Sequence, residues 1–349
     1  MSCIAVPQVV RDYTPAFVLL GALGAYTAYY YIRVVQKPQV FSKDGKFLQF
    51  IGRHIPMLRE PFRPTMWCFS YHLQTIGPVL MKLFHSVQYR SEKLQLADGG
   101  EIVLDWLDND GDERYSSATR PTILLLPGLT GSSKSHYAVN MISAASKHGY
   151  RSVVFNNRGF GGAEIRTPRT FCASNTEDLE YVIKYLHGVN PDAPVIAVGV
   201  SIGGFLAKEL TNVLARNVQM FEGHVDIHHA MQSQTIKEFD ERFTTKVFGY
   251  ETVDHYYADA SIHTKVHHIG IPTLCLSAGD DPFAPLETIP INDAKEQSNI
   301  ALVVTSHGGH VGFTEGFLPR GNGYMIRLFE QFVDGFFQHG MKEVLSSAE

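Results

Sequence analysis

The stretch PVIAVGVSIGGFLAKEL, residues 194–210, decides how the rest of the chain is interpreted. Its first half is a short apolar, β-branched run, which predicts a buried strand, and its second half has the spacing of a helix. Gly199, Ser201 and Gly203 lie between the two and form the pattern G-x-S-x-G. A serine at a strand-to-helix turn exposes its hydroxyl, so the pattern predicts a catalytic nucleophile at Ser201.

A tight turn rich in glycine and serine is the alternative interpretation of these five residues. The strand before them and the helix after them favour the nucleophile, because the catalytic motif requires that setting. Side chains at Gly199 and Gly203 would clash on so sharp a turn, and these two positions are therefore expected to be the glycines of a nucleophile elbow. The first turn of the following helix would direct its amides towards developing negative charge.

Composition indicates a large folded domain and excludes several functions. The 349 residues are 44% hydrophobic and 19% charged, enough for a sizeable core. The net charge of −5 comes from 30 basic and 35 acidic residues that are well mixed, so a nucleic-acid partner is not expected. The four cysteines show no CxxC spacing, which argues against a zinc site and a disulfide framework.

Strand and helix patterns alternate along most of the chain. The predicted strands are a hairpin over residues 92–108 and buried runs over 121–128, 151–159, 194–200, 271–282 and 299–310. The predicted helices cover residues 135–150, 175–189, 202–210 and 323–337. Parallel strands need such crossover connections, so the pattern predicts an α/β fold with a mostly parallel central sheet flanked by helices.

A serine nucleophile needs an acid and a base, which in this fold class follow it in the order Ser, acid, His. Asp281 follows a predicted strand directly and is the preferred acid, with Asp280 as its competitor and an ordinary turn role as the alternative for both. His310 follows the last predicted strand and is the preferred base, because two preceding glycines free the backbone to turn its ring inward. His307 is expected to be a solvated loop residue or a supporting donor.

Two backbone amides are expected to bind the oxyanion. Leu129 follows an early buried strand in the run LLLPGLTGSS, and Ile202 follows the nucleophile, so both N–H groups can point at one oxygen. A plain Pro-Gly turn at residues 127–128 is the alternative. The histidines of HTKVHHIG, residues 263–270, suggest a metal, but no carboxylate or cysteine completes a ligand set, and neither a metal nor another cofactor is expected.

The amino-terminal part resembles a membrane anchor. Residues 13–32 carry no formal charge over 20 positions, which is long enough to cross a bilayer, and their tyrosine cluster suits its interface. A cleaved signal peptide and a buried helix are the alternatives. We therefore predict an anchor over residues 13–35, an accessory segment without chemistry over 36–90, formed of irregular structure and short helices, and a catalytic domain over 91–340.

Several motifs together resemble the α/β-hydrolase domain-containing group of proteins 1 and 3. They are LLLPGLTGSS, VVFNNRGFGG, TPRTFCASNTEDLE, GVSIGG, DDPFAP and GGHVGFTEG. The resemblance covers the chain from the anchor to the last helix. It implies a triad of Ser201, Asp281 and His310, a single-pass type II protein of internal membranes, and hydrolysis of phospholipid acyl esters such as phosphatidylcholines, without a metal.

One departure from that group concerns the middle of the chain. Only 80 positions separate Ser201 from Asp281, and residues 210–240 show helix and polar linker patterns with no apolar strand. The α/β-hydrolase fold has another central strand here, followed by a cap. The chain therefore resembles a family member that lacks this strand and part of its cap.

These observations predict a membrane-anchored serine hydrolase that cleaves lipid acyl esters. Transfer of the acyl group to an alcohol would use the same triad. A non-enzymatic membrane protein is the other alternative, because the missing strand block would disturb a site that tolerates displacements of only about 1 Å.

Overall fold

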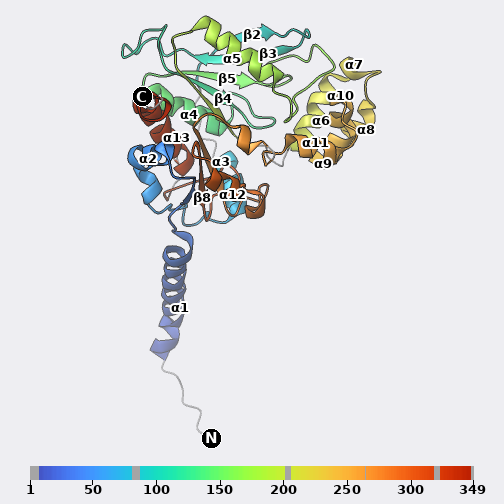
Figure 1. Ribbon diagram of the computed structural model, residues 1–349. Coiled ribbons are helices and arrows are strands. Elements are labelled where there is room, and N and C mark those ends of the chain that lie inside the picture. The colour runs from blue at the N-terminus through green and yellow to red at the C-terminus, as the bar shows by residue number, and fades with distance from the viewer. Residues whose placement is uncertain (1–7, 81–86, 201–205, 264, 318–322, 347–349) are drawn as a thin grey trace.

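A five-stranded sheet forms one half of the body (Figure 1). The computed structural model describes residues 8–80, 87–200, 206–263, 265–317 and 323–346. In spatial order the strands are β2 (Arg90–Gln95), β3 (Glu101–Leu107), β5 (Arg151–Asn156), β4 (Thr122–Leu126) and β6 (Val195–Gly199). The predicted hairpin is confirmed as the antiparallel pair β2–β3, and β4 runs parallel to both β5 and β6.

Helices cover both faces of this sheet, as the alternating sequence pattern predicts. On one face α4 (His136–Lys147) and α13 (Tyr324–Gly335) enclose a core that includes Ile123, Leu125 and Val154. On the other face α5 (Glu177–Val189) packs Val182 and Leu186 against the sheet.

A three-stranded sheet forms the other half of the body. Its order is β1 (Gln39–Phe41), β8 (Ile300–Thr305) and β7 (Thr273–Ala278), with β7 parallel and β1 antiparallel to β8. The helices α2 (Lys46–His54) and α13 pack on one face, and α12 (Ile291–Glu296) packs on the other. The accessory segment contains short helices as expected, α2 and α3 (Tyr71–Leu80), and it also supplies the strand β1, which was not predicted.

The two sheets are not joined by a strand within the described residues. β6 pairs with β4 and β7 pairs with β8, and β6 and β7 line one cavity between them. The chain that connects them forms helices and turns and contains no strand in its described part, in agreement with the departure predicted from the sequence. Its α-helices are α6 (Leu206–Arg216), α7 (Val218–Phe221), α8 (Ile227–Met231), α9 (Ile236–Phe239), α10 (Thr245–Phe248) and α11 (Val253–Ala260).

These connecting helices form a small unit around a core that also includes Ile165. Phe221, Phe239 and Phe243 pack together there, and both Phe221 and Phe243 are fully buried. Figure 1 places the unit at one side of the body, beyond the edge of the five-stranded sheet. The unit therefore does not occupy the position of a strand between β6 and β7.

The predicted transmembrane helix is not supported. The helix α1 (Gln8–Tyr29) projects away from the body in Figure 1, but within the described residues no helix combines the length and the apolar character needed to cross a bilayer. The prediction treated residues 13–32 as one span, but the described part of α1 is largely exposed whereas Tyr30 is buried in the body. Beyond Tyr29 the chain forms a short π-helix, Tyr30–Val34, whose Tyr30 is buried and donates a hydrogen bond of 2.6 Å to the carbonyl of Pro64.

Candidate active site

The strand-to-helix setting of the predicted nucleophile is present. β6 ends at Gly199 and α6 begins at Leu206, and the N–H of Val200 donates to the carbonyl of Leu126 at 3.0 Å. The predicted site residues Ser201, Ile202 and Gly203 lie outside the described residues. Their roles therefore remain predictions.

The crowding expected at Gly199 is not found among the described residues. A Cβ atom at this position would meet no described atom within 4 Å.

Asp281 and His310 form a direct pair. The Nδ1 atom of His310 lies 2.9 Å from Oδ2 and 3.1 Å from Oδ1 of Asp281. The N–H of Phe283 donates to Oδ1 of the same carboxylate at 2.8 Å, which fixes its orientation. Both side chains are largely buried, with side-chain exposures of 8% for His310 and 12% for Asp281. A carboxylate in this position can orient the imidazole and stabilise its protonated form.

The neighbouring Asp280 has a different role. Its Oδ1 accepts a hydrogen bond of 2.9 Å from the N–H of Gly309, so it holds the backbone of the histidine loop. Burial raises the pKa of the Asp280 carboxyl, and burial lowers the pKa of the His307 imidazole nearby. Asp280 therefore positions the loop, whereas Asp281 contacts the ring.

The other ring nitrogen of His310 is available for proton transfer. Nε2 is buried and has no hydrogen-bond partner among the residues described. The ring of Phe283 packs edge-on against the imidazole, with centroids 4.9 Å apart and an interplanar angle of 80°. A buried polar atom without a partner is costly in an inert loop, and a general base would present a ring nitrogen in this way.

The loop that carries His310 has an unusual backbone. Gly309, Val311 and Phe313 all have positive φ values, of 55°, 59° and 47°. Such values are uncommon for residues with a Cβ atom, and they mark a loop held by its surroundings. A Cβ atom at Gly309 would lie 2.6 Å from the carbonyl oxygen of Tyr71, so the glycine allows α3 to approach closely.

The helix α3 supports this loop, a role that sequence analysis missed. The hydroxyl of Thr75 accepts a hydrogen bond of 2.9 Å from the N–H of His310. Gln74 is fully buried, accepts from the N–H of Thr314 at 2.8 Å and donates to the carbonyl of Cys68 at 2.7 Å. The only local signal was a polar Gln-Thr pair in a largely apolar helix, which does not reveal a partner so distant in sequence.

The loop after β4, which contains Leu129, is anchored by a buried polar network. The amide of Asn156 donates to the carboxylate of Asp105 at 2.8 Å and its oxygen accepts from the N–H of Ser133 at 3.0 Å. The Ser133 hydroxyl also donates to Asp105 at 2.5 Å. Leu129 itself lies in the turn next to Thr130, whose φ is +68°. The network fixes the loop, while the assignment of the Leu129 amide to an oxyanion remains a prediction.

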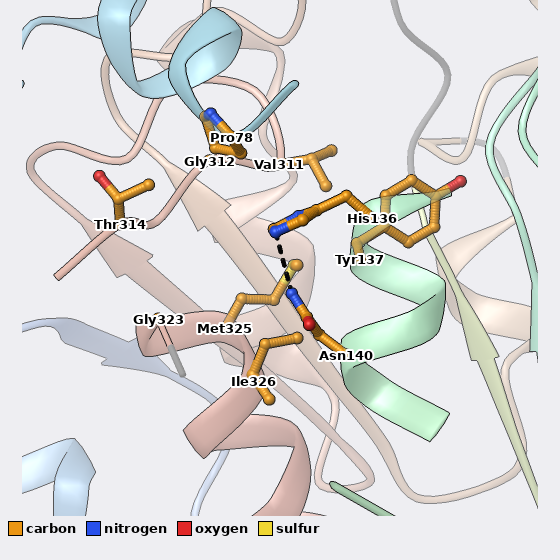
Figure 2. Close-up of a pocket in the computed structure, with 10 residues that line it drawn as sticks. All are labelled: Pro78, His136, Tyr137, Asn140, Val311, Gly312, Thr314, Gly323, Met325 and Ile326. Atoms are coloured by element: carbon orange, nitrogen blue, oxygen red, sulfur yellow. Dashed lines mark hydrogen bonds between the residues drawn. The ribbon is translucent and has the colours of Figure 1, made fainter. Parts of the chain in front are cut away.

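Two hollows adjoin the histidine loop. Figure 2 shows the smaller one, of about 30 Å³, between Pro78, His136 and Val311. Asn140 donates to Nε2 of His136 at 3.1 Å, and burial lowers the pKa of that imidazole. The larger cavity, of about 610 Å³, is lined by Asp281 and Val311 as well as by β6 and β7. Its volume is within the range of ligand sites, whereas the small pocket holds about one water molecule.

The strand order, the helices on both faces and the succession of β6 and α6 define the class of this protein as an α/β-hydrolase. A family model described as "alpha/beta hydrolase fold" matches residues 121–221. The chain is 42% identical over 369 residues to "Phospholipase ABHD3" of Bos taurus, covering 92% of this chain and 90% of the relative. It therefore belongs to the α/β-hydrolase family, within the group that includes phospholipase ABHD3.

A more distant relative and a solved structure are also similar to parts of this chain. The chain is 29% identical to "Putative esterase YheT" of Escherichia coli, with 74% of this chain and 88% of the relative covered. Among solved structures, the Pyrococcus furiosus esterase Pf2001 is 16% identical with a TM-score of 0.45, over 72% of this chain and 92% of that chain.

The alignment with the bovine relative also contains residues that this chain lacks. It has 369 positions, whereas 92% of the 349 residues is about 321, which leaves about 48 positions without a residue of this chain. A chain shortened in this way agrees with the departure expected from the sequence.

Proposed function

We propose that the chain is a serine ester hydrolase that cleaves acyl esters of phospholipids. One observation carries the proposal: the Nδ1 atom of His310 is held 2.9 Å from Asp281, while Nε2 of the same ring is buried and has no described partner. Family membership supports the same activity, because the mammalian relatives are named phospholipases.

The proposed reaction follows from these positions. The Ser201 hydroxyl attacks the ester carbonyl and forms the C–O bond while Nε2 of His310 takes its proton, and Asp281 stabilises the imidazolium. The amides of Leu129 and Ile202 stabilise the oxyanion. His310 then returns the proton to the leaving alcohol as the ester bond breaks. In the second half of the cycle water attacks the acyl-serine while Nε2 takes its proton, and the fatty acid leaves as the bond to the Ser201 oxygen breaks and that oxygen regains the proton.

The direct test is hydrolysis of phosphatidylcholine by purified protein. Wild-type protein is expected to release fatty acid, and Ser201→Ala is expected to abolish the release. Labelling with a fluorophosphonate probe gives an independent measure of the nucleophile. If folded wild-type protein neither labels nor releases fatty acid, the proposal is wrong.

A non-enzymatic membrane protein is the second candidate, and the interrupted sheet favours it. The predicted nucleophile follows β6 in one sheet, whereas Asp281 and His310 follow β7 and β8 in the other. No strand-to-strand hydrogen bond among the described residues sets the distance between these elements. The labelling experiment distinguishes the two candidates, because a non-enzymatic protein would fold but would not react with the fluorophosphonate probe.

We also propose that α1 attaches the protein to a membrane. Phe17, Leu19 and Leu20 are 63–71% exposed on a helix that projects from the body, and burying them in a lipid interface would be favourable. Flotation with phosphatidylcholine vesicles tests this. Replacement of these three residues by serine should release the protein from the vesicles, and unchanged flotation would contradict the proposal.

A further inference from the structure

The space between β6 and β7 has two peptide edges that face it. Alternate peptide groups of a parallel strand point to opposite sides. In β6 the N–H of Val200 and the carbonyl of Pro194 bond to β4, so the peptide groups of Val195, Ala197 and Gly199 point away from β4. These groups border the 610 Å³ cavity, which we call the slot.

The facing edge of β7 is arranged in the same way. The N–H groups of Thr273 and Gly279 donate to carbonyls beside β8. The peptide groups of Leu274, Leu276 and Ala278 therefore point into the slot. Two parallel edges thus border one cavity, and no described strand pairs with either edge.

The side chains of β6 and β7 alternate between the two faces in a way that fits one continuous sheet. Ile196 and Val198 of β6 contact the core that includes Phe329 of α13. Leu274 and Leu276 of β7 contact the core that includes Leu328 of the same helix. In a parallel sheet, side chains in register share a face and their peptide groups point in the same direction. In β6 and β7 the residues whose side chains face α13 have peptide groups that point in the same direction across the slot. This is the arrangement expected of two strands that flank one shared parallel strand.

We propose that the slot binds an extended peptide of another polypeptide, apolar on the face towards α13, which adds to β6 and β7 as a parallel strand. An acyl chain would also match the apolar floor that α13 provides, but it would leave the peptide groups of both edges unpaired. A strand satisfies those groups and buries apolar side chains against α13 at the same time. The proposal is independent of hydrolase activity.

The test uses a fluorescein-labelled peptide of sequence KTVTVTVTK and fluorescence anisotropy with the full-length Ser201→Ala protein. Valines on one face suit α13, and threonines suit the opposite face. Saturable binding is expected. The control peptide carries N-methyl groups on its valines and threonines, and it should bind at least about tenfold more weakly because it cannot donate to the edges.

A pair of variants locates the binding edge. Ala197→Pro removes an N–H that points into the slot without removing a hydrogen bond to β4, and it should weaken binding about tenfold. Ala197→Val keeps that N–H and should bind as the parent does. A benzophenone at the carboxyl end of the peptide should crosslink near Ala284 and Val311, and one at the amino end near Ile271.

Three results would overturn the proposal. They are absence of binding by the unmodified peptide, equal binding of the N-methylated peptide, and crosslinks in the reverse order. Equal binding of both peptides would identify an apolar cavity for chains such as lipid acyl groups. The two peptides can be compared whether or not Ala197→Pro folds, so the proposal remains testable in either case.

Discussion

The Thr75 hydroxyl accepts a hydrogen bond of 2.9 Å from the main-chain N–H of His310, although the two residues are 235 positions apart. The helix that carries Thr75 precedes every strand of the five-stranded sheet. The segment before the predicted catalytic domain is therefore part of the structure that holds the candidate base.

Replacement of Thr75 by valine should impair turnover without unfolding the protein. Valine has the same shape but offers no acceptor to the His310 N–H, so the imidazole is held less firmly. We expect kcat to fall about tenfold with little change in KM. Thr75→Ser keeps the hydroxyl and should recover most of the activity. An equal fall in kcat in Thr75→Val and Thr75→Ser would contradict a role for the hydrogen bond.

Replacement of Asp281 by asparagine should be far more damaging than the same change at Asp280. Asparagine cannot stabilise an imidazolium, and in a catalytic triad this change costs about 10⁴-fold in kcat. Asp280→Asn keeps an oxygen that can accept from Gly309 and should retain most of the activity. Ester hydrolysis by both variants checks the assignment, and the opposite order of effects would make Asp280 the catalytic acid.

Replacement of Gly312 by alanine should destabilise the protein. A Cβ atom at this position would collide with the carbonyl oxygen of Gln74, so α3 or the histidine loop must move. We expect a loss of about 1–3 kcal/mol in the free energy of unfolding. Gly188→Ala is the control, since nothing lies within 4 Å of its Cβ position and alanine favours the helix α5. Urea unfolding of both variants provides the measurement.

Asp280→Asn should also stabilise the protein at neutral pH. Burial raises the pKa of this carboxyl, so the folded state disfavours its charged form. As pH falls through the raised pKa of Asp280 in the folded state, the unfolding free energy of the wild-type protein rises towards that of the variant. The difference between the two unfolding free energies vanishes below the pKa of the unfolded state, about 3.9. Unfolding free energies of both proteins between pH 7 and pH 4 check this, and a difference that grows on acidification would contradict it.

The strands other than β1 were predictable because their signals are local. The apolar runs that became β4, β6, β7 and β8 are short and bounded by turn residues, and the hairpin is marked by Asp98 and two glycines. The proximity of Asp281 and His310 was also predictable. Both follow neighbouring parallel strands, and the carboxyl ends of such strands meet at one edge of the sheet.

Other features depend on contacts that no local pattern encodes. The supports that Thr75 and Gln74 give to the histidine loop join segments far apart in sequence. The length of the apolar stretch over residues 13–32 suggested a membrane span, but Tyr30 packs into the body and the uninterrupted α-helix ends at Tyr29. Hydropathy alone could not show where the body begins.

The helix α13 touches both halves of the divided sheet, through Ile326 and Phe329 on one side and Tyr324 and Leu328 on the other. The same helix therefore packs on the core beneath β6 and on the core beneath β7, and this shared packing contributes to how the strand before the predicted nucleophile lies relative to the strand before Asp281.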